Sequence, residues 1–298
     1  MGSIPRSVGG RFALELDGAA AGFVKSVEGG DISADVVAEP VGQQPFAKKH
    51  IGNVKYEEFT LGMELGMSAD VYEWIAGSWA GTSTRRNGAI VEADANLEVK
   101  MRREFRDALV TETTVPALDA SAKSPAELTV RVAPDSITRT KGSGKLARAA
   151  AKQKQWLVAN FRLELGDLDA KTVSKIDAFT VKQTVAADGL GARRDHRREP
   201  GTIEFPNLRV TLAESGAQTW NDWFDDFVVK GNNGDDREKN GSIVFLDPSL
   251  KQELGRVDLK NVGIFALRRP SPAGDRVARV TAELYVESME LNWKSFSK

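Results

Sequence analysis

Hydrophobic and polar residues alternate in a short segment near the start of the chain. Phe12, Leu14 and Leu16 recur at every second position, and Glu15 lies between the two leucines. A period of two is typical of a strand with one buried face. The same pattern, Phe-x-Leu-Glu-Leu, returns at Phe161, an offset of 149 residues (161 − 12 = 149). The pattern therefore predicts equivalent strands at two places in the chain.

The offset extends beyond this strand. It carries Trp74 onto Trp223, and the alternating segment at residues 128–134 corresponds to residues 280–286 with an offset of 152 (280 − 128 = 152). Two copies of one unit of roughly 150 residues account for nearly all of the chain, and each copy is long enough to bury a core. Catalysis seldom needs the same scaffold twice in one chain, whereas a symmetric assembly often does. The repeat therefore favours a role in assembly.

The copies predict two domains, at residues 1–140 and 159–298, joined by a linker at residues 141–158. The linker opens with Gly142-Ser-Gly and continues with an alanine-rich stretch. Glycine and serine give a flexible hinge, and alanine favours a helix. We refer below to the two predicted domains as the first and the second half.

The apolar face of one predicted strand slips by one residue between Tyr56 and Phe59. The second half has the same slip, between Phe205 and Leu208. A phase change within a strand is typical of a β-bulge, which bends the strand. We therefore expect curved sheets, each with open edges that only sister molecules satisfy. The segment 32–52 before the slip is expected to form a long loop or a splayed hairpin.

A helical period follows each of these strands. Aromatic residues between Trp220 and Phe227 recur at a spacing of three to four, and residues 71–75 carry the matching stripe in the first half. Such stripes are expected to seal a helix onto the sheet rather than to stack on a ligand. Ser68 is the expected N-cap of the first helix, and Ser215 with Gln218 forms the expected capping box of the second.

Composition excludes several classes of function. The chain of 298 residues has no cysteine, a net charge of −1 and 41% hydrophobic residues. The lack of cysteine removes disulfides and thiolate nucleophiles, and the balanced charge provides no global field for nucleic acid. No apolar run reaches the roughly 18 residues of a membrane span, and the N-terminus does not resemble a signal peptide. We expect synthesis in the cytoplasm and no membrane partner.

Candidate chemical groups are few. His50 and His196 are the only histidines, and they do not correspond in the repeat because 196 − 149 = 47. Two histidines without cysteine do not make a usual zinc set. Asp222, Asp225 and Asp226 share the helix face opposite the tryptophans, where a solvated polar surface is expected. We predict no catalytic, cofactor-binding or metal site and no cofactor.

Two further motifs have ordinary explanations. The segment Gly142-Ser-Gly-Lys145 resembles a phosphate loop, but Arg139 and Leu146 stand where that loop requires glycine and serine or threonine. The segment 232–236 lacks the ligand spacing of a calcium loop and is expected to be a hairpin tip. The basic residues of the linker lack interleaved aromatic residues, which favours a solvated face over nucleic-acid binding. These basic residues are Lys145, Arg148, Lys152 and Lys154.

Segments from both halves resemble the tail-tube proteins of contractile phages and of phage-like contractile injection systems. The most specific is segment 12–31, which opens Phe-Ala-Leu-Glu-Leu-Asp-Gly, and segment 50–61, which opens His-Ile-Gly-Asn-Val, is the second. Segments 241–247, 255–261 and 282–291 are similar to the C-terminal part of that family. The resemblance implies a mainly β fold of two tandem tail-tube-like barrel or sandwich domains, each with one packed helix.

The resemblance also implies a function. Members of the family assemble into six-fold rings around a lumen, and the loop after the second strand reaches neighbouring subunits. We therefore expect a structural, non-enzymatic component of the inner tube, or of an adaptor or initiator ring, in a phage tail or injection particle. Its expected partners are copies of itself, tail-tube, sheath or baseplate proteins, and cargo in the lumen.

The tandem form departs from the family pattern and leaves alternatives open. Either three chains form a pseudo-hexamer or six chains form the ring. A binding module that docks cargo, effector or baseplate components without forming the shaft is the alternative function. An enzyme would need a polar cleft that brings His50 or His196 beside Asp222.

Overall fold

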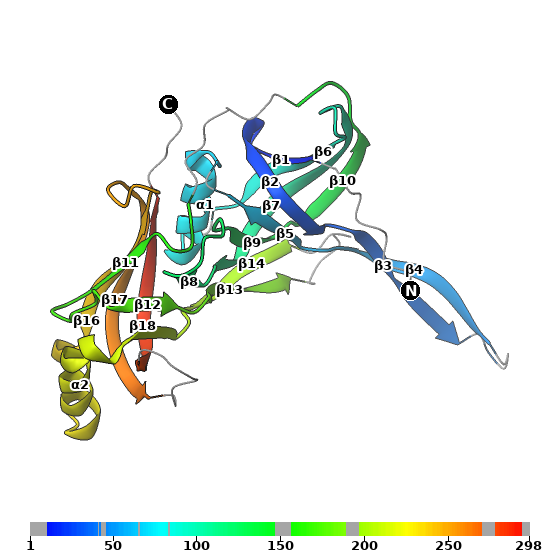
Figure 1. The fold of residues 1–298 in the computed structure, drawn as a ribbon. Coiled ribbons are helices and arrows are strands. Elements are labelled where there is room, and N and C mark those ends of the chain that lie inside the picture. Colours follow the sequence, from blue (N-terminus) through cyan, green and yellow to red (C-terminus); the bar gives the residue numbers. More distant parts are fainter. Residues whose placement is uncertain are drawn as a thin grey trace.

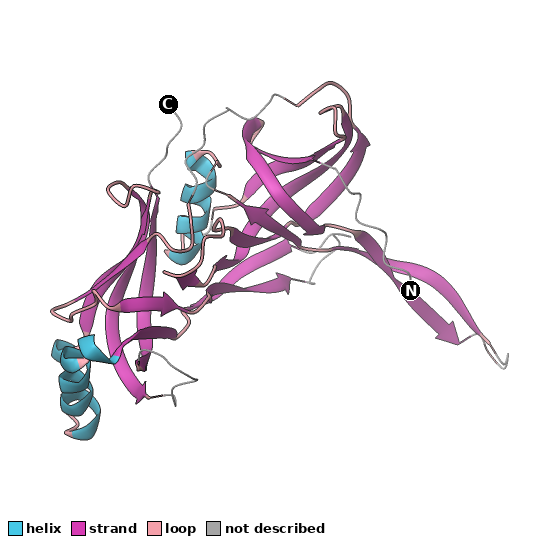
Figure 2. Ribbon diagram, in the orientation of Figure 1, coloured by secondary structure: helices cyan, strands magenta, loops and turns pink. Residues whose placement is uncertain are grey.

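The computed structural model describes residues 11–293 except for 41, 43–45, 65, 83, 147–155, 189–196 and 270–277. Strands dominate this part of the chain, as predicted (Figure 2). The strands are β1 (Arg11–Leu16), β2 (Ala19–Gly29), β3 (Ile32–Pro40), β4 (Ala47–Tyr56), β5 (Phe59–Met63), β6 (Arg86–Ala93), β7 (Val99–Val115), β8 (Leu118–Asp119), β9 (Leu128–Ala133), β10 (Ser136–Lys141), β11 (Phe161–Leu165), β12 (Val173–Ile176), β13 (Phe179–Asp188), β14 (Arg197–Glu204), β15 (Leu208–Ala213), β16 (Lys239–Leu246), β17 (Glu253–Arg268) and β18 (Arg279–Trp293). The helices are α1 (Ala69–Trp79) and α2 (Gln218–Phe224), with short turns η1 (Glu214–Gly216), η2 (Asp225–Val229) and η3 (Asp235–Arg237).

Six strands of the first half close into a barrel. Their order is β7-β6-β1-β2-β5-β9, and β9 returns to pair with β7. Leu14, Phe59 and Phe105 are almost fully buried inside it. Closure leaves this sheet with one short free edge, at residues 112–115 of β7, where β6 no longer pairs. The first half is therefore a closed barrel apart from that edge, rather than the open sheet expected from the sequence.

The second half has the corresponding strands but stays open. Its sheet runs β11-β16-β17-β18-β15-β12, and β8 of the first half extends it at β12. No pairing joins β11 to β12 among the described residues, whereas β1 and β2 form a tight hairpin at Asp17-Gly18. The chain between β11 and β12 is instead held by α2, because Trp220 Nε1 donates to the Asp169 carbonyl at 2.9 Å. The open flank expected from the sequence is thus present in this half.

The two halves share irregular backbone features as well as their element order. Asp107 in β7 and Asn261 in β17 both have positive φ, at 49° and 51°. Leu97 and Leu250, which precede these strands, do so too, at 66° and 60°. The ladders also shift register at equivalent places, at Val110/Glu112 and Ile264/Ala266. Residues other than glycine rarely adopt this conformation, so the correspondence supports the predicted tandem repeat.

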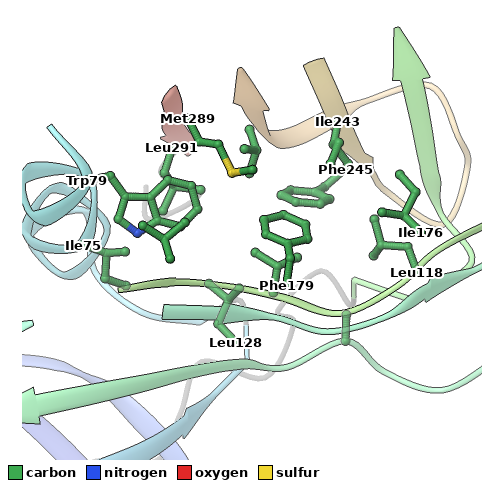
Figure 3. Packing of buried hydrophobic residues seen from close by; sticks show 14 of the residues in the cluster. Ile75, Trp79, Leu118, Leu128, Ile176, Phe179, Ile243, Phe245, Met289 and Leu291 are labelled. Atoms are coloured by element: carbon green, nitrogen blue, oxygen red, sulfur yellow. The ribbon is translucent and has the colours of Figure 1, made fainter. Parts of the chain in front are cut away.

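One continuous core joins the two halves. Helix α1 lies between the barrel and the open sheet (Figure 1), and its Tyr72 ring stacks on Trp293 of β18 with a centroid distance of 4.8 Å. Figure 3 shows Ile75 and Trp79 of α1 beside Met289 and Leu291 of β18. The halves therefore pack as one body in this region.

The end of the predicted linker belongs to this core. Trp156 is 2% exposed, its ring lies 4.5 Å from that of Phe245, and its carbonyl accepts a hydrogen bond from Ala126. The alanine-rich stretch lies outside the described residues. The domain boundaries remain a prediction, but the linker ends in a buried residue.

Several local predictions differ from the structure. The phase slip is a break between two strands rather than a bulge, because β4 pairs in a separate hairpin with β3 while β5 enters the barrel. The N-cap of α2 is Ala217, so the predicted Ser215 capping box is wrong. Ser68 is the N-cap of α1 but makes no side-chain cap hydrogen bond. The tryptophan stripes are core as predicted, with Trp74 and Trp220 buried.

Candidate assembly surface

The hairpin β3–β4 leaves the barrel and forms a sheet of its own (Figure 1). It carries five of the nine large hydrophobic side chains that are exposed among the described residues. They are Ile32, Val36, Val37, Phe46 and Ile51, and Val36, Phe46 and Ile51 are each more than 60% exposed. A lone two-stranded hairpin is marginally stable in water, and clustered exposed apolar groups mark interaction sites. This hairpin therefore presents a surface that favours a partner.

The return strand of the hairpin is basic. Lys48, Lys49 and His50 follow one another along β4, and all three are exposed. His50 lies 3.8 Å from Glu39 on the neighbouring strand. The protruding hairpin thus combines apolar side chains with positive charge.

The second half has the corresponding hairpin, β13–β14, in the same register. Both ladders shift at equivalent positions, Ala34/Val36 and Gln183/Val185. The second hairpin is not bare, because β13 pairs with the free edge of β7 in the first half, from Phe179↔Val115 to Lys182↔Glu112. We call this contact the seam.

The seam buries apolar side chains that the bare hairpin exposes. Phe179 and Val181 of β13 are 4% and 3% exposed, whereas Ile32, which corresponds to Val181, is 40% exposed. The hydroxyl oxygens of Thr114 and Thr180 lie 2.8 Å apart across the seam. Docking on the barrel thus buries the start of β13 in the core, whereas most of β14 stays exposed.

Charged groups fasten β14 to the barrel. The Asp135 carboxylate accepts a hydrogen bond from the Arg198 backbone N–H at 2.9 Å and lies 3.0 Å from Arg85. Arg85 also contacts Glu199 at 3.2 Å. The Arg198 guanidinium donates to the Tyr56 carbonyl at 2.7 Å. The side chains of Arg85 and Asp135 are largely buried, and burial raises the pKa of Asp135 despite these partners.

The corresponding edge of the second half is open. The pairings of β7 and β17 place residues 266–269 where residues 112–115 lie in the first half. Within the described part of the chain, this stretch of β17 pairs with β18 on one side and with no strand on the other. Phe265, directly before it, is 43% exposed. Helix α1 of the first half packs on β18 of the second half, whereas α2 packs on β17 of its own half. Val229, in the turn η2 that follows α2, is exposed.

The residues that replace the seam's charged groups are acidic. Glu238 corresponds to Arg85, and Glu287 corresponds to Asp135. The Tyr285 hydroxyl donates to Glu238 at 2.6 Å, and burial, then this bond and the charges of Glu238, Glu287 and Asp235, raise the pKa of Tyr285. The second half therefore has a carboxylate where the first half has Arg85.

Two of the three aspartates predicted to lie on a solvated helix face, Asp222 and Asp226, line a shallow hollow of about 390 Å³. Asp222 accepts a hydrogen bond from Gln218, Asp226 accepts one from Asn232, and Asp225 is exposed. His196 lies outside the described residues, and Figure 1 places β4, with His50, and α2 at opposite ends of the molecule. The cleft that an enzyme would need is thus not formed by His50 and Asp222.

A second hollow, of about 550 Å³, lies on the outside of β1, β6 and β7. One of its two arginines, Arg102, is held by Glu15 in a two-point ion pair at 3.0 and 2.6 Å. In the parts of the chain that are described, no group of three or more histidines, aspartates or glutamates is arranged to hold a metal. Neither α1 nor α2 has the length and apolar character needed to cross a bilayer.

The remaining motifs have structural roles. The Gly144 carbonyl accepts a hydrogen bond from the Val99 backbone N–H, and the backbone of Lys145 forms an isolated antiparallel β-bridge with that of Glu98. The phosphate-loop-like segment thus extends the pairing of β10 with β7. Arg148, Lys152 and Lys154 lie outside the described residues. The segment 232–236 connects η2 to β16 through η3, so its assignment as a hairpin tip is wrong.

The seam residues were missed in the sequence. A signal was present, because Lys48-Lys49 and Arg197-Arg198 are separated by the repeat offset (197 − 48 = 149). The barrel residues that contact the hairpin give no such signal, because the equivalent positions in the two halves, Arg85 and Glu238, have opposite charges.

Residues 9–138 match the family model described as T4-like virus tail tube protein gp19. The resemblance to the tail-tube family is confirmed for this part of the chain. A search of the curated proteins gave no match.

Solved structures with a related fold come from contractile particles. A chain of the PVC sheath–tube complex of an extracellular contractile injection system is 22% identical, with a TM-score of 0.39, over 47% of this chain and 92% of that chain. A chain of the anti-feeding prophage cap, its tube terminating cap, is 23% identical, with a TM-score of 0.38, over 48% of this chain and 93% of that chain. Each similarity spans about half of the present chain.

Proposed function

We propose that the protein is a structural, non-enzymatic ring subunit of the inner tube, or of a tube-adjacent ring, in a contractile phage tail or injection particle. The observation that carries the proposal is the seam. The hairpin β13–β14 of the second half docks on the barrel of the first half, while its counterpart β3–β4 extends from the first half without a partner in the chain. An arm and an unfilled edge on the same chain favour head-to-tail assembly, which closes as a ring or grows as a filament.

The family match of residues 9–138 supports the tube-type role. The tandem copies would each occupy one place in a ring, so a chain fills two places and three chains give a pseudo-hexamer. Six chains, with one half of each in the tube and the other outside it, are the second arrangement. The role is passive in either case, since the ring encloses a channel and outer loops dock the neighbouring tail components.

Electron microscopy and native mass spectrometry of the purified chain test the proposal. The expected result is a ring with a central channel, and the mass distinguishes three chains from six. A chain that stays monomeric at high concentration and binds no tube, sheath or baseplate component would refute the proposal. Stable capture of a cargo or effector protein without ring formation would instead favour a binding module.

A further inference from the structure

The open edge of the second half corresponds, through the repeat, to the edge that β13 occupies in the seam. It carries Glu238 and Glu287, while its Arg268 and Arg269 pair with Glu283 and Glu214. We infer that β3–β4 of one chain docks on this edge in a second copy of the chain, in the register of the seam and with one of its ion pairs reversed. The inference rests on the proposed head-to-tail assembly and names the two surfaces that meet. We call the edge, with residues 266–269, Glu238 and Glu287, the receptor edge.

The backbone register follows from the seam. Val181 lies opposite Thr113 in the chain. The repeat offsets convert Val181 into Ile32 (181 − 149 = 32) and Thr113 into Leu267 (113 + 154 = 267). Ile32 is 40% exposed and Leu267 is partly buried at the edge of the apolar cluster. Adding a strand there satisfies the unpaired backbone groups of both edges.

The charges agree with the same register. In the seam, the backbone N–H of Arg198 donates to the Asp135 carboxylate at 2.9 Å. Burial raises the pKa of that carboxylate, and the positive charge of Arg198 lies close enough to oppose this larger effect. The corresponding residues are Lys49 and Glu287, which keep the same polarity. Lys49 and Glu287 are both exposed.

The second pair is reversed. Arg85 contacts Glu199 in the seam at 3.2 Å, and the corresponding residues are Glu238 and His50. The receptor residue has changed from Arg85 to Glu238, and the arm residue has changed from Glu199 to His50. Each pair thus still combines an acidic with a basic residue type although every residue has changed, and this points to contact between these two surfaces.

The receptor carboxylates have neutral partners within the chain. Glu238 accepts from Tyr285 and Glu287 accepts from Asn261, each at 2.6 Å. Among the described residues, neither has a lysine or arginine within 4.0 Å. A basic strand from another copy supplies the missing cations.

Engineered disulfides test the register, and the chain suits them because it has no cysteine. Directly opposed residues in an antiparallel ladder have Cα atoms about 4.5–5.5 Å apart, within the range that a disulfide spans. On mild oxidation, I32C/L267C is expected to give disulfide-linked oligomers. The control T113C/V181C samples the same contact within one chain and is expected to cross-link without an increase in mass.

Charge reversal tests the pairing. K49E and E287K, each added to I32C/L267C, are expected to lower the initial rate of interchain cross-linking about five- to tenfold, as for the loss of one partly exposed ion pair plus repulsion. The combination K49E/E287K restores the attraction and is expected to recover most of that rate. K251E, at an exposed lysine in the β16–β17 loop, is the matched control and should leave the rate unchanged.

The outcomes separate this inference from the proposed function. Interchain cross-links that respond to the charges as described support it. Rings or oligomers that form without I32C/L267C cross-links, or cross-links that ignore K49E and E287K, overturn the inference and leave the proposed function standing. A chain that neither associates nor cross-links overturns both.

Discussion

Trp156 provides a direct test of whether the two halves share one core. The linker predicted from the sequence includes it, but its side chain is 2% exposed between the barrel and the open sheet. Its ring contacts those of Phe245 and Trp293, with centroid distances of 4.5 and 5.8 Å. W156A removes these contacts and leaves a cavity that the surrounding strands fill only in part.

The expected loss is about 3–5 kcal/mol in the free energy of unfolding, the usual range for truncating a buried tryptophan. A residue of a solvated linker would cost less than about 0.5 kcal/mol. The two interpretations therefore differ by more than the error of a denaturation experiment.

Urea unfolding followed by far-UV circular dichroism measures the difference. S143A, at an exposed serine of the same linker, is the matched control and should unfold within about 0.5 kcal/mol of the wild type. The continuous core also predicts that both halves unfold in one transition. A midpoint for W156A equal to that of S143A, or a separate first transition confined to one half, would refute the reasoning.

Three further predictions concern other parts of the fold. L250G is expected to be neutral to about 1 kcal/mol stabilising in thermal unfolding, because it relieves a positive φ at an exposed residue, whereas L97G loses about 1–2 kcal/mol with its buried side chain. D135A removes one of the two carboxylates that contact Arg85 and the acceptor of the Arg198 backbone N–H, and it should cost about 2 kcal/mol, with faster hydrogen exchange in β13; unchanged exchange there would contradict the seam. Burial raises the pKa of Tyr72 and of Tyr285 above the ordinary value of about 10. The unfolded chain therefore releases these protons first, so their stabilising contribution is complete below pH 10 and is lost as the pH rises above it, which unfolding midpoints between about pH 8 and 11 would show.

Much of the local structure follows from residue patterns. The alternation at Phe12–Leu16 and its copy at Phe161 gives β1 and β11, and the tryptophan stripes give the buried faces of α1 and α2. These features depend on the periods of strand and helix, which a single segment of sequence already contains. The resemblance to tail-tube proteins followed from local motifs in the same way.

Local patterns were misleading where two segments had to be assigned to different sheets. The slip between Tyr56 and Phe59 resembled a bulge because a break and a bulge both shift an alternating pattern by one residue. Which one occurs depends on the partners of β4 and β5, and these partners are distant in the chain.

The residues alone established two similar β units, their strands and helices, and the positions where the backbone turns. Only the tertiary structure determined that one unit closes while the other stays open, that Trp156 lies in a shared core, and that one hairpin is docked while its twin is bare. The reason is physical: side-chain period is a property of a segment, whereas strand pairing and burial of charge depend on what the rest of the chain brings to that segment.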